Sequence, residues 1–189
     1  DMLTLRGGLV IDPASAFAAP ADVFLADGLV VAIHPPGEQP PVGRLLDVAG
    51  LVVAPGLVDI HVHLREPGQT HKETIASGTR AAVAGGFTTV CCMPNTAPPL
   101  ERPERVREVG EIIRRDAACR VRVIGNCCLD NGPERLAGAG ALRDAGCVAV
   151  TDDAYPLQEQ SHRAEALERA SSAGLPFIAH CEDKSLSRD

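Results

Sequence analysis

From residue 57 to residue 180, short apolar segments alternate with segments of helix length, and this order restricts the fold more than any other feature. The apolar segments cover residues 57–64, 87–93, 121–125, 147–151 and 176–180. Helices are expected between them, over about 72–84, 133–145 and 160–172, with one more starting near Pro103. Parallel strands need long crossover connections, and strands buried on both faces read as continuous apolar runs, so the order predicts parallel βα units.

Two α/β architectures fit such units, an open doubly wound sheet and a (β/α) barrel. A nucleotide-binding open sheet carries a GxGxxG or GxxxxGK[ST] loop after its first strand. Neither motif follows residues 57–64. This weakens the nucleotide-binding open-sheet interpretation and favours the barrel, of which about five strands would be present, without deciding between the two.

The first 54 residues have a different pattern, which is typical of a small β unit. An apolar run ends at Asp12-Pro13, and two further runs flank Asp27-Gly28, a favoured hairpin turn. The sequence therefore predicts two parts, a small β unit at 1–54 and a series of βα units at 55–189.

Charge and composition argue against several classes of function. The formal net charge is −7, with one Tyr and no Trp, so the chain offers neither a basic stripe nor a stacking platform for nucleic acid. No run approaches the ~18 to 20 apolar residues of a membrane span, and the first residues do not resemble a secretion signal. We expect a cytoplasmic protein that binds neither nucleic acid nor membrane.

Cysteine usage argues against a disulfide scaffold. The chain has seven cysteines, an odd number, and no CxxC motif. The adjacent pairs Cys91-Cys92 and Cys127-Cys128 lie in apolar runs, so we expect reduced cysteines that act as small core hydrophobes. Cys181 is also expected in the core, because an alternating strand would point it away from its neighbour His180.

The first expected barrel strand ends in polar side chains. His61, His63 and Arg65 are spaced by two residues, so they would share one face of a strand. Two imidazoles placed in this way can bind one divalent metal, at the strand end where barrel enzymes place reacting groups. Taken alone, an HxH is also compatible with ordinary polar placement.

Two further strand ends carry metal-binding residue types. Asp153 follows the strand at 147–151, and His180 closes the strand at 176–180. A helix-cap aspartate and a satisfied core histidine are the alternatives for each residue by itself. Asp152 is the alternative to Asp153, because sequence does not fix a one-residue register.

Two segments resemble the signature segments of dihydroorotases. They are His61-Val62-His63-Leu64-Arg65-Glu66-Pro67-Gly68-Gln69 and Met93-Pro94-Asn95-Thr96. Hydantoinases, dihydropyrimidinases and allantoinases share the HxH strand but usually lack both segments. The likeness extends over the chain and matches the longer bacterial type of the family.

The resemblance implies an amidohydrolase-type (β/α)₈ barrel with a β-sandwich made from both chain ends and a zinc centre of one or two ions. Residues 1–54 would then be a β-sandwich segment, and residues 55–189 the first half of the barrel. By position, His61 and His63 would hold the first metal, His180 the second, and Asp153 would bridge them. Many relatives use a carboxylated lysine as the bridge. The chain has two lysines, Lys72 and Lys184, and neither ends the fourth strand.

The resemblance also implies a reaction. A dihydroorotase reversibly hydrolyses the cyclic amide of dihydroorotate to N-carbamoyl-L-aspartate in pyrimidine biosynthesis. Arg65 and Asn95 would bind the ring carboxylate of the substrate, since a guanidinium fork and an amide suit that group. A further metal histidine and the general acid/base aspartate of the family are expected beyond residue 189, so no catalytic acid or base is assigned here.

Family members run to roughly twice this length, so we expect a fragment that is inactive by itself. A homodimer and association with aspartate carbamoyltransferase are possible partnerships within the family. The alternatives to a dihydroorotase are a non-catalytic scaffold subunit of the same family and another cyclic amidase.

Overall fold

The computed structural model describes residues 1–130, 132, 135–153 and 155–187. The chain divides into two compact units, Asp1–Pro55 and Gly56–Asp189. The division falls one residue from the domain boundary expected from the sequence. Among the described residues, no helix is long and apolar enough to cross a membrane.

The first unit forms a single sheet in the part of the chain that is described. Its strands are β1 (Met2–Asp12), β2 (Phe17–Ala26), β3 (Leu29–His34), β4 (Arg44–Asp47) and β5 (Val52–Val53). The order is β3-β2-β1-β4, with β5 also paired to β1; β1–β2 and β2–β3 are antiparallel, and β4 and β5 run parallel to β1. The turn between β2 and β3 has φ values of 49° at Asp27 and 81° at Gly28, and the predicted hairpin is confirmed.

In its described residues, the second unit contains five parallel strands in the order β10-β9-β8-β7-β6. Its elements are β6 (Leu57–Val62), α1 (Ile75–Ala84), β7 (Phe87–Cys92), α2 (Pro103–Asp116), β8 (Arg120–Asn126), α3 (Ala139–Asp144), β9 (Cys147–Thr151), α4 (Gln160–Ser172) and β10 (Phe177–Ile178). The predicted series of parallel βα units is confirmed. Each strand pairs with its neighbour in sequence, so the carboxyl ends of all the strands meet at one edge.

Several element boundaries differ from those expected; α1, for example, begins at Ile75 and not near residue 72. The first barrel strand ends at Val62, two residues early, and β10 covers two residues only. The third helix was expected over 133–145, but α3 begins at Ala139, and residues 133 and 134 lie outside the described part. The amide of Ala137 donates to the carbonyl of Cys127 at 2.8 Å, so residue 137 is bonded to the segment after β8 and not within a helix.

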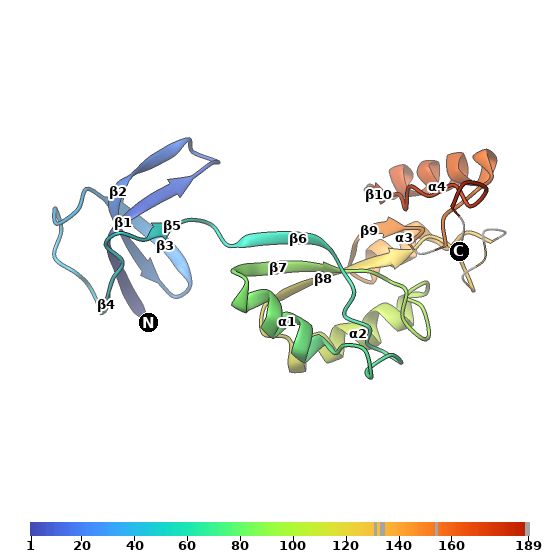
Figure 1. Cartoon of the computed structure of the whole chain (residues 1–189), viewed down its shortest axis with the longest axis horizontal. Helices are drawn as coiled ribbons and strands as arrows, with labels where there is room; N and C mark the ends of the chain where they lie inside the picture. The colour runs from blue at the N-terminus through green and yellow to red at the C-terminus, as the bar shows by residue number, and fades with distance from the viewer. Residues whose placement is uncertain (131, 133–134, 154, 188–189) are drawn as a thin grey trace. The chain divides into compact units, whose positions relative to one another are not determined.

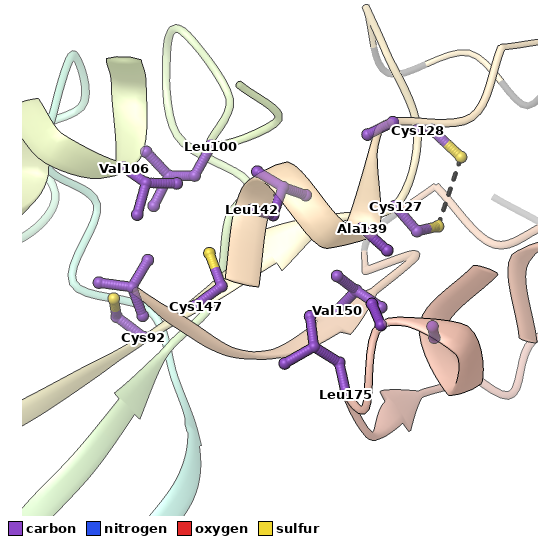
Figure 2. Packing of buried hydrophobic residues seen from close by; sticks show 14 of the residues in the cluster. Cys92, Leu100, Val106, Cys127, Cys128, Ala139, Leu142, Cys147, Val150 and Leu175 are labelled. Carbon is purple, nitrogen blue, oxygen red and sulfur yellow. Dashed lines mark hydrogen bonds between the residues drawn. The ribbon is translucent and has the colours of Figure 1, made fainter. Parts of the chain in front are cut away.

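The core of this unit has two parts. The larger cluster lies between the sheet and its helices and includes Leu100, Val109, Leu142 and Val150, several of which Figure 2 shows. The smaller cluster consists of Cys91, Met93, Ile124 and Ala149. Consecutive strand residues point to opposite faces, so β7 contributes Cys92 to the larger cluster and Cys91 to the smaller. In Figure 1, α1 and α2 lie together on one side of β7 and β8.

The cysteines are all free, as predicted. Burial raises the pKa of Cys92 to about 12 and that of Cys147 to about 12, so both thiols are neutral core groups near pH 7. The prediction for Cys181 is wrong. Its side chain is exposed, because β10 ends at Ile178 and strand alternation does not continue to residue 181.

A capping box starts α1. The hydroxyl of Thr74 accepts from the Ser77 amide at 3.0 Å, and the Ser77 hydroxyl accepts from the Thr74 amide at 3.1 Å.

We expect Thr74→Ala to lower the free energy of unfolding by about 1 kcal/mol, measured by urea denaturation. Thr74→Ser keeps the acceptor and serves as the control; equal losses in both variants would contradict a capping role.

Candidate metal centre

His61 and His63 lie at the carboxyl end of β6. Their ring centroids are 5.2 Å apart, with an interplanar angle of 66°. The amide of Met93 donates to the carbonyl of Val62 at 2.8 Å, which ties this end of β6 to the end of β7. The two imidazoles are therefore held at the edge where the strands of the sheet end.

Asp153 brings a carboxylate to the same place from the end of β9. Its Oδ2 lies 3.0 Å from Nε2 of His61. One ligand atom from each of His61, His63 and Asp153 lies within 4.8 Å of the others. The structure thus brings together three of the four residues that the sequence suggested as metal ligands.

The donor set fits a divalent metal. Two imidazole nitrogens and one carboxylate oxygen form a common three-residue set at catalytic zinc sites, which leaves a further position open. Asp153 is buried, whereas 46% of the His61 side chain is exposed. The carboxylate is therefore shielded on the protein side, and the cluster stays accessible to a small ligand from solvent.

The two adjacent aspartates have different surroundings. The Asp152 carboxylate accepts from the His180 amide at 2.7 Å and from the Leu157 amide at 2.9 Å. Both of its oxygens are therefore used to hold the chain after β9 and β10. Asp153, and not the alternative Asp152, faces His61.

His180 lies outside this three-residue cluster. Its Nδ1 is 3.5 Å from Oε2 of Glu182, and its amide is held by Asp152. The main chain at the end of β10 is thus anchored to the strand end that carries Asp153. The role of His180 as a ligand of a second metal stays a prediction.

Asn95 connects two members of the cluster. Its Oδ1 lies 2.8 Å from Nδ1 of His63, and its Nδ2 donates to Oδ1 of Asp153 at 3.4 Å. A partner at the second imidazole nitrogen fixes the tautomer and orientation of a ligating histidine. Sequence reasoning suggested Asn95 as a substrate contact and missed this positioning contact, for which spacing along the chain gives no signal.

Arg65 departs from the strand geometry expected for it. β6 ends at Val62, and Arg65 has a φ of 60°, in the left-handed region. From the sequence, Arg65 was expected to share one strand face with His61 and His63. Because β6 ends before Arg65, strand alternation does not fix the direction of its side chain. Its role in binding a carboxylate stays a prediction.

The two signature segments contact each other beside the cluster. The amide of Ala97 donates to the carbonyl of Pro67 at 3.1 Å, and Nε2 of Gln69 donates to the carbonyl of Asn95 at 3.2 Å. The loop after β6 therefore supports the main chain of Asn95, whose side chain contacts His63.

Comparison with known proteins identifies the family of the chain. The family model described as dihydro-orotase-like matches residues 50–189. The chain belongs to the dihydroorotase-like family. It is 45% identical over 185 residues to the dihydroorotase of Solibacter usitatus, covering 98% of this chain and 43% of that protein. The dihydroorotase of Aquifex aeolicus is 42% identical, with 98% and 44% covered.

Solved structures extend the likeness to the fold. The L-hydantoinase (dihydropyrimidinase) of Arthrobacter aurescens superposes with a TM-score of 0.84 at 22% identity, over 97% of this chain and 41% of that one. The five parallel strands of this dihydroorotase-like chain form a curled half-barrel of that architecture. The chain spans about 43% of the length of the curated relatives that it matches.

Proposed function

We propose that the native protein containing this sequence is a dihydroorotase, which reversibly hydrolyses the cyclic amide of dihydroorotate to N-carbamoyl-L-aspartate in pyrimidine biosynthesis. One observation carries the proposal: the two signature segments contact each other beside a cluster of two histidines and an aspartate. The identity of 45% and 42% to curated dihydroorotases supports it.

We propose zinc as the metal, with His61, His63 and Asp153 as ligands and His180 as a ligand of a second ion. Imidazole nitrogen and carboxylate oxygen are donors that zinc takes. When bound, a divalent metal supplies Lewis-acid chemistry for the attack of water on an amide carbonyl. The buried Asp153 holds its carboxylate against His61, which prepares this part of the site before a ligand enters.

Substrate choice rests on Arg65 and Asn95 in this proposal. The guanidinium of Arg65 can pair with the ring carboxylate of dihydroorotate through two parallel hydrogen bonds. Asn95 would donate to the same carboxylate and also keep the imidazole of His63 in place. No general acid or base is assigned among residues 1–189.

The proposal also covers the location of the protein in the cytoplasm and its partners. Seven free cysteines fit the reducing environment of the cytoplasm. A homodimer and association with aspartate carbamoyltransferase stay predictions.

Replacement of Arg65 tests the proposed substrate. In the native protein, we expect Arg65→Met to lower kcat/KM for dihydroorotate by about 10- to 100-fold, since hydrogen bonds to charged groups contribute about 1.5–3 kcal/mol. Zinc content, measured by atomic emission, should stay unchanged. Arg65→Lys keeps the charge but not the planar fork and should recover part of the activity.

Two outcomes would favour the alternatives. Equal turnover of dihydroorotate and the neutral dihydrouracil by the unmodified protein would contradict a carboxylate-selecting site and favour a dihydropyrimidinase. A native protein that purifies without zinc and binds none on titration would instead favour a non-catalytic scaffold subunit.

A further inference from the structure

Two adjacent cysteines follow β8 and share one side of the chain. The sulfur atoms of Cys127 and Cys128 are 3.5 Å apart (Figure 2). Both side chains belong to the larger core cluster, with exposed fractions of 6% and 1%. They share no residue with the candidate metal centre, and the proposed reaction gives them no role.

The other adjacent pair, Cys91-Cys92, shows that sequence adjacency alone does not produce this geometry. Cys91 and Cys92 lie within β7, where consecutive side chains point to opposite faces. They therefore belong to different core clusters. Cys127 and Cys128 come after the last residue of β8, Asn126, where strand alternation no longer separates the two sulfurs.

The main chain around the second pair is fixed by hydrogen bonds. The amide of Cys127 donates to the carbonyl of Thr151 at 2.8 Å, and the amide of Cys128 donates to Oδ1 of Asn126 at 3.0 Å. These bonds hold both sulfurs on one side before any ligand binds. Preorganised donors of this kind bind a shared atom with little loss of conformational freedom.

The spacing favours a bridging atom over a direct disulfide. Adjacent Cα atoms across a trans peptide are about 3.8 Å apart, below the ~4.4 to 6.8 Å usual for a disulfide. Direct oxidation would therefore strain the peptide that joins the cysteines. A third atom bound by both sulfurs would span the gap with less distortion.

The surroundings permit a small ligand only. A cavity of about 10 Å³ borders Cys127 and is lined mainly by apolar side chains, including Leu142 and Val150. This volume is about that needed for one water molecule. The contact with the Cys127 sulfur lowers the pKa of Cys128, whereas the same contact, together with burial, raises the pKa of Cys127, so Cys128 loses its proton more readily than Cys127.

We propose that Cys127 and Cys128 form a two-thiol site for a single trivalent arsenic atom, a soft centre of the kind that thiolates prefer. Arsenous acid, As(OH)₃, would exchange two of its hydroxides for the two sulfurs. The two S–H protons leave with those hydroxides as two water molecules. Two As–S bonds form, one hydroxide stays on arsenic, and no oxidation state changes.

Arsenite is the probe for this site. The native protein would be incubated with arsenite and a phosphine reductant, desalted, and analysed for arsenic per chain. We expect one arsenic per chain and the loss of two titratable thiols. Cys127→Ala and Cys128→Ser should each reduce arsenic to background, whereas the double variant Cys91→Ala/Cys92→Ala should retain it.

Two further measurements separate the site from general effects on folding. Cys147→Ala removes a similarly buried thiol, 4% exposed, and should retain arsenic; its loss there would overturn the assignment. X-ray absorption of the arsenic-loaded wild type should give two sulfur neighbours per arsenic, without any need for variants. One or three sulfur neighbours, or no retained arsenic, would equally overturn the proposal.

Discussion

Asp153→Asn should weaken zinc binding by at least about 100-fold. Changes in groups that only support metal ligands cost about 10- to 100-fold in affinity, and this substitution removes the charge of a ligand itself. In the structure, Oδ2 of Asp153 lies 3.0 Å from Nε2 of His61, so the carboxylate and the imidazole are already placed for a common metal. Isothermal titration of the metal-free protein with zinc would measure the loss.

The stability of the folded protein gives a second readout of the same change. Zinc at one hundred times its dissociation constant stabilises a folded protein by about 2.7 kcal/mol. A 100-fold weaker site at the same zinc concentration would be stabilised by less than about 0.5 kcal/mol. Zinc should therefore raise the Tm of the wild type clearly and that of Asp153→Asn only slightly.

Asp152→Asn is the matched control. The Asp152 carboxylate accepts two main-chain amides, from Leu157 and His180, on its two oxygens. An asparagine has one acceptor oxygen, so one buried amide would lose its partner, at a cost of about 1–3 kcal/mol in the free energy of unfolding. Zinc affinity at the site formed by His61, His63 and Asp153 should change far less than in Asp153→Asn. The reverse pattern, with Asp152→Asn the more damaging to zinc binding, would show that the two aspartates have been assigned the wrong way round.

The parallel βα series could be predicted from sequence because strands that are buried on both faces consist almost entirely of apolar residues. The apolar run at residues 87–93 contains β7 almost residue for residue. Strand ends depend on tertiary bonds instead. His180 was expected in a strand, but its amide bonds to the Asp152 side chain and not to a strand neighbour, so β10 stops at Ile178.

The candidate site could likewise be predicted only in part. Spacing and strand position were enough to suggest His61, His63 and Asp153, because each lies at a strand end and parallel strands end at one edge. The contact of Asn95 with His63 could not be derived in this way. It requires the loop after β7 to be held beside the end of β6, and that arrangement rests on contacts between segments about thirty residues apart, such as Gln69 with Asn95.

Gly68→Ala should disrupt the packing of the loop after β6 against the segment after β7. We expect no other added methyl group to have a larger structural effect. Gly68 has a φ of 84°, where L-residues are strained by about 1–2 kcal/mol. A Cβ at this position would lie 1.8 Å from the carbonyl oxygen of Ala97. Backbone atoms cannot rotate away as a side chain can, so the loop after β6 would have to separate from the segment that follows β7.

That separation would reach the metal centre through Asn95. The contacts of Pro67 with Ala97 and of Gln69 with Asn95 would stretch together, and Asn95 would lose its fixed position against His63. We therefore expect Gly68→Ala to lower the free energy of unfolding by more than the strain alone and to weaken zinc binding by about 10-fold or more. Gly174→Ala is the control, because Gly174 also has a positive φ, 67°, but a Cβ there would meet nothing within 4 Å. Urea denaturation and zinc titration of both variants would isolate the clash, and equal losses in the two would contradict the close contact between the signature segments as its cause.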